Sequence, residues 1–560
     1  MKNLTINFKR TIALLILMVG MGSCEKYMDL VPKDQVTDGT VWATASNADM
    51  FLNTIYGALP TPYRNEDPDE NRTDHSLGKP NNSSTRLYKK SAYTAQSPGP
   101  ANLINGSSTY TLWNFYNTIR KANLFIQNVT ASTVLSDSYK KSRLAEVRFL
   151  RAYYYMLLWT HYGGVPVITD VLNISEQGDA VFRPRNTDAE TYQFIVAECA
   201  AVAPDLPNAQ GNGRATRGAA LTLKAWCELW NASPLKNPSN DLAKWTLAAA
   251  TYKQVMDLGT YTLFPNYETM LYEANEKSSE VIFAKEHLGG VGSLGSHREG
   301  QWGPFKAGGS QQSWCGVNPT QDIVDAYRMS NGKLISDPSS GYNPQNPYVN
   351  REKRFYSSII YDGSIWLGSA MVMKQGVGSE NATDINNSSD ATNTGYYLRK
   401  SLEERNAFNG ANNRSGADFQ IFRYGEVLLA YAEAQNEAVG PDQSVYDAVN
   451  KVKARSELPP LPSNLSKAQM RDAIQQERRV ELFFEEKRWY DLIRLKTAET
   501  ILNGTSKAMR IDQVSGKWVY KVINAPAGAM VFNAGRDYYW PIPQSAIDRN
   551  DKLTQNPLYD

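Results

Sequence analysis

Cysteine and histidine are scarce in this chain, since each occurs only four times in 560 residues. So few cysteines exclude a small scaffold stapled by disulfides. A bridge between Cys199 and Cys227 stays open as an alternative to free thiols. The histidines lie far apart except for His287 and His297, and no third ligand accompanies those two. We therefore expect neither a metal site nor another cofactor.

An excess of one charge is also missing. Lys and Arg number 59 and Asp and Glu number 57, which leaves a net charge of +2. A general nucleic-acid binder needs a net basic face, so we expect no nucleic-acid partner. Beyond the N-terminus, the sequence has no apolar run of the ~18 residues or more that a membrane-spanning helix requires.

The first 23 residues are typical of a targeting signal. An apolar run, Ile12 to Met21, follows the basic residues Lys2, Lys9 and Arg10. This run is too short to span a membrane and fits the apolar region of a secretory signal peptide. Two small residues then precede Cys24, as in the bacterial lipobox, where the cysteine is acylated and the chain is cut before it. We expect removal of residues 1–23 and lipid on Cys24, and a plain signal peptide with a coincidental cysteine is the alternative.

Helical and irregular stretches alternate along the rest of the chain, after a lead segment at 24–44. Apolar residues at helical spacing and end signals predict several helices. These are 45–59, 109–129, 137–161, 187–203, 216–232, 241–258, 266–276, 419–438, 442–456 and 466–497.

Two long excursions interrupt the helices. Residues 60–108 are rich in Pro, Asn, Ser and Gly, and residues 281–415 mix similar stretches with short β-rich runs. The β-rich runs are 281–285, 355–361 and 396–399. We expect a single domain over 45–560, with a helical frame at about 45–59, 109–280 and 416–500 and an irregular tail at 501–560. Such excursions inside a folded chain are usually functional.

The helix pairs predict a mainly α fold of the tetratricopeptide type, an α-solenoid. In the segment 419–438, Ala430 and Ala434 are small enough to let a neighbouring helix approach closely. A strict 34-residue period, typical of tetratricopeptide repeats, is absent.

The predicted helix 466–497 is apolar on more than one side and also carries many charges. Glu477 and Glu481 could form a paired-carboxylate acid/base site. We favour ion pairing instead, because both lie mid-helix with arginines beside them. The spacing predicts three pairs three residues apart: Arg478–Glu481, Glu485–Arg488 and Asp491–Arg494.

Several motifs together resemble the SusD/RagB family of outer-membrane nutrient-binding lipoproteins, from Cys24 to Asp560. They are Glu146–Ala152, Tyr162–Pro166, Arg214–Thr216, Asn318–Gln321, Phe419–Leu429, Val449–Arg455, Glu477–Leu482, Arg488–Leu492, Tyr539–Pro543 and Gln555–Pro557. The sequence departs from the family pattern at Gly425, where Ala is usual, and at Glu485-Glu486, where a turn residue is common.

The resemblance implies a binding protein with no catalytic residue. Family members carry tetratricopeptide-like helix pairs that pack on a SusC-like TonB-dependent transporter, and an irregular lobe that faces outward and holds a glycan. Acids soon after Cys24, at Glu25 and Asp29, resemble the surface-export signals of Bacteroidetes lipoproteins. We therefore expect a lipid-anchored protein at the outer membrane that is exposed on the cell surface. One alternative is that the protein captures peptide or protein. A second, less favoured alternative is that it is a lipid-anchored glycoside hydrolase.

Aromatic residues of the excursions are the candidates for glycan binding. Tyr (32) and Trp (12) together far outnumber Phe (17), and their rings combine an apolar face with a polar group. Trp302 and Trp314 lead, because they lie in Gly- and Gln-rich loops without helical spacing. The remaining candidates are Tyr63, Tyr88, Asn81 and Arg86 in the first excursion, and Trp366, for which a structural role is favoured. The tryptophans expected in the core are Trp113, Trp159, Trp226, Trp245, Trp489 and Trp540.

Overall fold

The structure, a computed structural model, describes residues 38–559 except 65–67, 79–84, 99–111, 209–212, 291–294, 308–309, 377–380, 382–390 and 407–413. The expected signal segment, Cys24 and Asn81 lie outside the described residues, and so does the side chain of Arg86.

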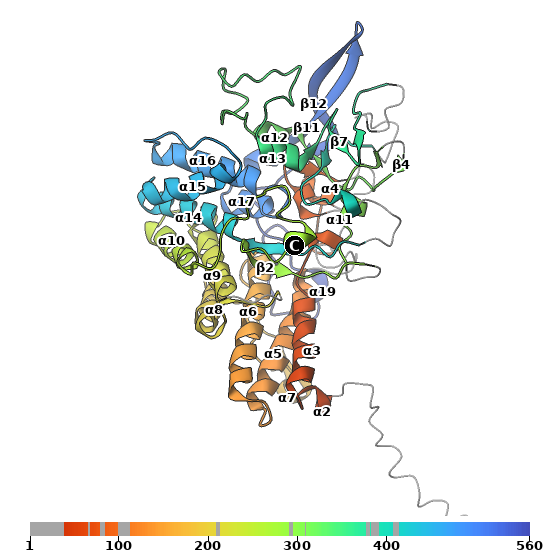
Figure 1. The fold of residues 1–560 in the computed structure, drawn as a ribbon. Helices are drawn as coiled ribbons and strands as arrows, with labels where there is room; N and C mark the ends of the chain where they lie inside the picture. Colours follow the sequence, from red (N-terminus) through yellow and green to blue (C-terminus); the bar gives the residue numbers. More distant parts are fainter. Residues whose placement is uncertain are drawn as a thin grey trace, which may run out of the picture.

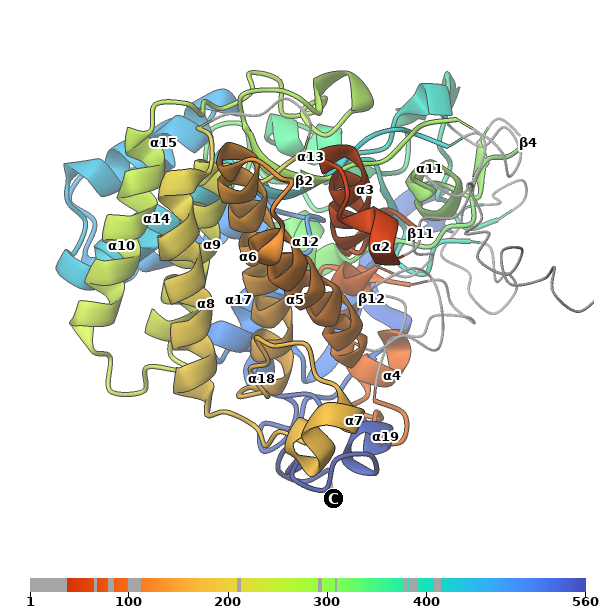
Figure 2. The same ribbon diagram turned by 90° about the horizontal axis from the view of Figure 1, so that it is seen from below.

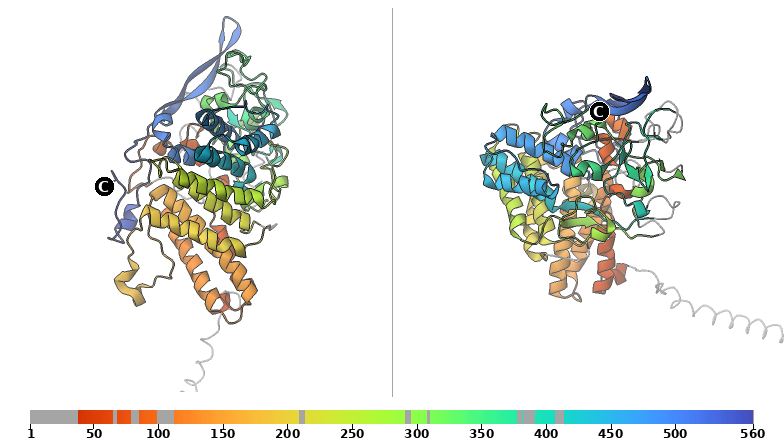
Figure 3. Two further views of the ribbon diagram at one scale, coloured as in Figure 1. Left: turned by 90° about the vertical axis from the view of Figure 1, so that its left-hand side faces the viewer. Right: turned by 45° about the horizontal axis from the view of Figure 1, so that its top comes forward.

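The frame consists of antiparallel helices that stand side by side in chain order (Figures 1 and 3). They are α3 (Ala45–Gly57), α5 (Phe115–Ala131), α6 (Asp137–Tyr162), α8 (Asp188–Val202), α9 (Arg217–Ala232), α10 (Leu242–Asp257), α14 (Tyr424–Val439), α15 (Gln443–Arg455) and α16 (Lys467–Glu481). Helix α10 packs directly against α14 although residues 258–423 separate them. The predicted mainly α, tetratricopeptide-like arrangement is confirmed, and these helices match most of the predicted ones within a few residues.

Local sequence signals explain where these helices begin and end. Thr187 and Glu190 form a capping box at the start of α8, and Ser466 and Gln469 do the same for α16. Helix α6 ends at Gly163, whose φ of 76° suits glycine, and its N–H donates to the carbonyl of Trp159. Ala430 and Ala434 are buried in α14, as close helix packing requires.

In the described part of the chain, strands pair only in twos and always antiparallel. The short pairs lie in the lobe formed by the excursions: β1 (Ser76–Leu77) with β5 (Asn318–Pro319), β3 (Lys306–Ala307) with β4 (Ser310–Gln311), β6 (Ile359–Ile360) with β9 (Tyr397–Leu398), and β7 (Ile365–Trp366) with β8 (Ser369–Ala370). Strand β2 (Val281–Lys285) pairs with β10 (Phe419–Arg423), so the two ends of the second excursion meet.

The predictions for four segments differ from the structure, besides that for the helix 466–497. Residues 419–423 form β10 before α14 begins, so the predicted helix 419–438 starts as a strand. Residues 266–276 form turns and a three-residue 3-10 helix, and the β-rich run 355–361 is mostly helix α13 (Lys353–Ser358). The tail, expected to be irregular, contains a long hairpin of β11 (Gly504–Val514) and β12 (Lys517–Met530) that projects from the body (Figure 1).

The predicted helix 466–497 is broken between α16 and α17 (Arg488–Arg494). Phe484 and Glu486 adopt left-handed backbone angles, with φ of 58° and 61°, which a continuous helix cannot contain. The break lies at the departure from the family pattern, and it turns Glu485 into the interior.

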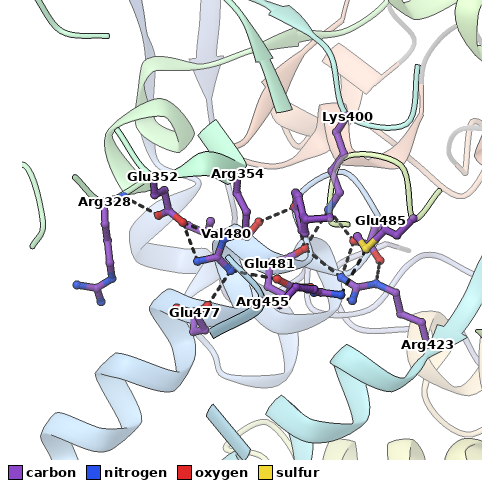
Figure 4. Close-up of polar contacts among 12 residues, drawn as sticks. Arg328, Glu352, Arg354, Lys400, Arg423, Arg455, Glu477, Val480, Glu481 and Glu485 are labelled. Carbon is purple, nitrogen blue, oxygen red and sulfur yellow. Dashed lines mark hydrogen bonds and ion pairs between the residues drawn. The ribbon is translucent and has the colours of Figure 1, made fainter. Parts of the chain in front are cut away.

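Behind this break lies a buried ion network that joins frame and lobe (Figure 4). Glu481 accepts contacts from Arg354 (3.0 Å), Arg423 (2.9 Å) and Arg455. Glu485 pairs with Arg423 and Lys400, both at 2.6 Å. The remaining carboxylates are Glu352 and Glu477, both on Arg354, and Glu280, on Arg423 and Arg455. Arg354 and Lys400 come from the second excursion, whereas α15, α16 and β10 belong to the frame.

The arginines of the network keep Glu481 and Glu485 ionised, because they lower the pKa of both carboxyls. Burial raises the pKa of Glu481, but the guanidiniums of Arg455, Arg423 and Arg354 outweigh it and hold that pKa well below its ordinary range. Burial lowers the pKa of Lys400 to about 8, against the opposing effect of Glu485.

Glu477 and Glu481 are therefore ion-paired, as favoured, but with distant partners. Of the predicted pairs, Asp491–Arg494 forms at 2.8 Å. The other two are wrong, since Arg478 binds Asp491 and Arg488 binds Asp74.

We expect Glu481→Gln to lower the free energy of unfolding by about 3–5 kcal/mol, because three buried arginines lose charge compensation. Glu457→Gln is the matched control. It removes an exposed pair, with Lys353, that also links α13 to the frame and should contribute at most about 1 kcal/mol. Denaturant unfolding followed by circular dichroism measures both. Equal stability of the two variants would contradict the role given to the network.

Candidate functional site

Trp302, one of the two leading candidates, is a core residue. It ends the short helix α11 (Arg298–Trp302), and its side chain is 0% exposed. The indole meets Tyr63 and Phe484 edge-to-face, with ring centroids 5.6 and 5.0 Å apart. Tyr63 is buried too, under the guanidinium of Arg298 at 4.7 Å. The prediction that Trp302 and Tyr63 contact a glycan is therefore wrong for this structure, because one helical turn directs the indole inward.

Two further candidates serve packing. Tyr88 is half-buried and stacks on Tyr93 with ring centroids 4.6 Å apart, next to Trp540 at 5.4 Å. Trp366 is buried, with the guanidinium of Arg399 5.7 Å from its ring, so the favoured structural role of this residue is confirmed. Neither ring offers an open face to a sugar, which corrects their place among the ligand contacts.

Among the candidates whose side chains the structure describes, Trp314 is the one that lies at the surface, at 41% exposed. It follows the β3–β4 hairpin of the lobe, and its backbone N–H donates to the carbonyl of Gly300 at 3.1 Å. Two residues later, the N–H of Gly316 donates to the carbonyl of Gln301 at 2.7 Å. The ring centroid lies 6.3 Å from that of Phe305. The indole thus projects from a loop whose backbone is held on both sides.

Two glutamines lie close to this ring along the chain: Gln311 is exposed, and Gln312 is half-buried. Glutamine offers both donors and acceptors, and an aromatic face buries the C–H face of a sugar, so this surface has the chemistry that a glycan needs. We name the surface of Trp314, Phe305 and these glutamines the Trp314 surface.

A second aromatic group, which the sequence did not reveal, lies where the lobe meets the turn-side half of the β11–β12 hairpin. The ring of Tyr348 lies within 4.5–6.1 Å of those of Phe355, Tyr361, Tyr396 and Tyr520. Tyr361 and Tyr520 are partly exposed, and the hydroxyl of Tyr520 donates to Asp362 at 3.2 Å. The excess of tyrosine over phenylalanine was the available signal, but it did not say where the rings gather.

A pair of buried acids lies beneath the lobe. Oε1 of Glu70 lies 2.7 Å from Nδ1 of His75. Its second oxygen and both oxygens of Glu486 have no hydrogen-bond partner among the described residues. Burial raises the pKa of Glu70 to about 8 and that of Glu486 well above its usual range. A nearby interior cavity of about 80 Å³, lined by Glu485, Glu486 and apolar rings, is too small for a sugar chain.

The described residues can be searched for a metal site and for a membrane-spanning helix, neither of which is expected from the sequence. No group of three or more metal-ligating side chains occurs within them, and no helix there is long and apolar enough to cross a bilayer. Cys199 and Cys227 are both buried thiols without a bridge.

We expect stability to fall as pH rises from about 6.5 to about 8. The folded state keeps a proton on Glu70 in this range, which the unfolded chain, with an ordinary carboxyl pKa near 4.5, has lost. The window avoids His75, whose lowered pKa costs stability only below about pH 6.5. Glu70→Gln should flatten the fall of Tm with pH, and Glu70→Gln/Glu486→Gln should flatten it further. The surface variant Glu457→Gln should keep the wild-type slope. An unchanged slope in Glu70→Gln would show that this carboxyl is ionised at pH 7.

Comparison with known proteins agrees with this architecture. The model of the SusD family matches residues 279–559, and a second family model, described as "Starch-binding associating with outer membrane", matches residues 26–227. A SusD-like protein from Formosa agariphila is 23% identical over 558 residues, which cover 94% of this chain and 98% of that protein. A SusD-like protein from Bacteroides ovatus is 25% identical over 68% of this chain and 64% of its own.

Solved structures show the same fold. A SusD-like protein from Bacteroides fragilis superposes with a TM-score of 0.77 at 26% identity, over 94% of this chain and all of that one. A SusD-like carbohydrate binding protein from the same species gives 0.77 at 25% identity, over 92% of this chain and all of that one. Surface glycan-binding protein A from Bacteroides uniformis, at 18% identity and a TM-score of 0.66, shares the fold over 92% of this chain and 99% of its own. With one family model over half of its length and the helical frame, lobe and relatives in agreement, this chain belongs to the SusD family, whose members bind carbohydrate in association with the outer membrane.

Proposed function

We propose that this protein captures oligosaccharide or polysaccharide at the cell surface and does not process it chemically. The observation that carries the proposal is the Trp314 surface, an exposed indole on a fixed loop in the lobe of a SusD family member. The carboxylates with the most suggestive spacing, Glu477 and Glu481, are buried in ion pairs and face no open cleft. They support a structural role in place of glycoside hydrolysis.

We further propose that the protein delivers its ligand to a SusC-like TonB-dependent transporter. The helical frame supports this role, because it offers rigid, continuous outer faces on which a partner can dock (Figure 3). Leu242 and Leu247 are exposed on α10, and exposed leucines on a rigid helix are suited to a protein interface.

The lipid anchor on Cys24 completes the proposal. Helix α2 (Asp38–Val41), where the described chain begins, lies at the end of the molecule opposite the β11–β12 hairpin (Figure 1). A chain tethered near α2 would therefore present its lobe away from the membrane.

Cys24→Ala should move the protein from the membrane fraction to the soluble fraction, because acylation needs the thiol. Ser23→Ala, which keeps a small residue before the cysteine, should remain in the membrane fraction. Detergent-phase partitioning of cells that express each variant measures this. Retention of Cys24→Ala in the detergent phase would refute the anchor.

Trp314→Ala should weaken binding of the cognate glycan about ten- to hundredfold, as the loss of a stacked ring worth ~1–3 kcal/mol implies. Its Tm should stay close to wild type because the ring lies at the surface. Affinity gels with a panel of polysaccharides identify the ligand, and titration calorimetry then gives the affinities.

Two tryptophan controls sharpen this experiment. Trp518→Ala removes an equally exposed ring, at 40%, from the β11–β12 hairpin and should bind like wild type. Trp302→Ala should lower Tm sharply because it opens a core cavity. Wild-type affinity in Trp314→Ala would remove this loop from the site. Binding of a parallel peptide panel, with no glycan bound, would favour the peptide-capturing alternative.

A further inference from the structure

A pocket of about 240 Å³ shares no lining residue with the Trp314 surface. Three segments distant in sequence form it: the start of α5, the segment after α6, and the C-terminal segment that contains α19 (Gln544–Ile547). Figure 2 shows α19 and α7 (Ile174–Gln177) together on one side of the molecule, with β4 on the opposite side. The pocket is therefore separate from the proposed glycan surface.

Its inner wall is aromatic and apolar. Trp113, expected to be a core residue, is only half-buried and lines the pocket together with Tyr116. The two ring centroids are 5.1 Å apart, and Trp113 also meets Tyr162 edge-to-face at 5.2 Å. The hydroxyl of Tyr116 donates to the carbonyl of Pro166 at 2.7 Å. Both rings are thus fixed in place before any ligand arrives.

The polar residues around this wall are uniformly neutral or basic. They are Asn114, Ser545, Asn550, Arg183 and Arg549, and no acidic residue lines the pocket. Among the described residues, none makes a hydrogen bond or ion pair with the side chain of Arg549, Asn114 or Ser545. Arg183 pairs with Asp170 at 3.2 Å, but both side chains are nearly half exposed, so the pair is weak and can be exchanged for a ligand.

Hydrogen bonds across the segments hold the pocket open. Asn550 Nδ2 donates to the carbonyl of Arg183 at 2.9 Å, and Arg185 Nη1 donates to the carbonyl of Thr554 at 2.9 Å. The C-terminal segment is thereby tied to the loop that carries Arg183. A preformed pocket loses less conformational entropy on binding than one that must assemble.

We propose that this pocket binds a single sugar ring that carries a carboxylate, a hexuronate. The volume lies below the ~300–1,000 Å³ of typical ligand pockets, which suits one ring and not a chain. The face of Trp113 can cover the C–H face of the sugar, and the amide and hydroxyl groups can bond its hydroxyls. The guanidiniums of Arg549 and Arg183 supply charge-assisted hydrogen bonds for the carboxylate.

The inference extends the proposed function by adding a second site and an acidic sugar class, and it does not depend on the Trp314 surface. Titration calorimetry of the full mature chain with D-glucuronate, D-glucose and sodium sulfate tests it. Glucuronate should bind, glucose should bind at least about tenfold more weakly, and sulfate alone should not reproduce the affinity.

Variants locate the binding. Arg549→Ala should weaken glucuronate binding about tenfold or more without a change in Tm, because the side chain is exposed. Lys552→Ala removes a positive charge three residues away that does not line the pocket, and it should bind glucuronate like wild type. Trp314→Ala should leave glucuronate binding unchanged, whatever it does to the main glycan.

Each contrary result overturns the inference. Absence of glucuronate binding at about 10 mM, or wild-type binding by Arg549→Ala, would show that the pocket is not the site. Equal binding of glucose would refute the acidic class, and equal binding of sulfate would reduce the pocket to an anion site. Loss of glucuronate binding in Trp314→Ala would place the uronate on the Trp314 surface instead.

Discussion

The arginine–glutamate network between frame and lobe is the constraint on which the rest of the structure depends. Each buried charge costs several kcal/mol to remove from water, and only close pairing offsets that cost. Arg354 satisfies this requirement only if α13 docks on α16, and Arg423 only if β10 lies beside the break after Glu481. The lobe can therefore dock on the frame in one position only, although its own strand pairs are short.

This fixed position explains how an irregular lobe can carry the proposed binding surface. A ring contributes to sugar binding only if it is already held where the ligand arrives. The backbone bonds that hold Trp314 run to residues next to Trp302, and Trp302 packs on Tyr63 and on Phe484 at the helix break. The buried ion network thus fixes the helix break, the break fixes the aromatic core around Trp302, and that core fixes the loop that carries the Trp314 indole.

The helical frame was predictable because its signals are local. Caps such as Thr187 with Glu190, and stops such as Gly163, act within a few residues and mark helix ends well. The errors occur where distant contacts decide. Residues 419–423 form a short run of mixed apolar and polar side chains that fits a helix or a strand, and only pairing with β2 selects the strand. Likewise, the burial of Trp302 depends on Tyr63 and Phe484, which sequence spacing cannot bring to its side. The break at Phe484–Glu486 had a signal in the departure from the family pattern, but not one strong enough to end a helix.

The packing of α10 directly on α14 has a consequence for how such proteins diversify. Residues 258–423 leave the solenoid and return to it at adjacent positions, where the pairing of β2 with β10 closes the excursion. Because the free-energy cost of closing a loop grows only slowly with its length, residues between β2 and β10 can be added or replaced at little cost to the stability of the frame. The helical frame can thus stay unchanged while the inserted lobe is exchanged, so ligand choice can change during evolution without a change in the frame.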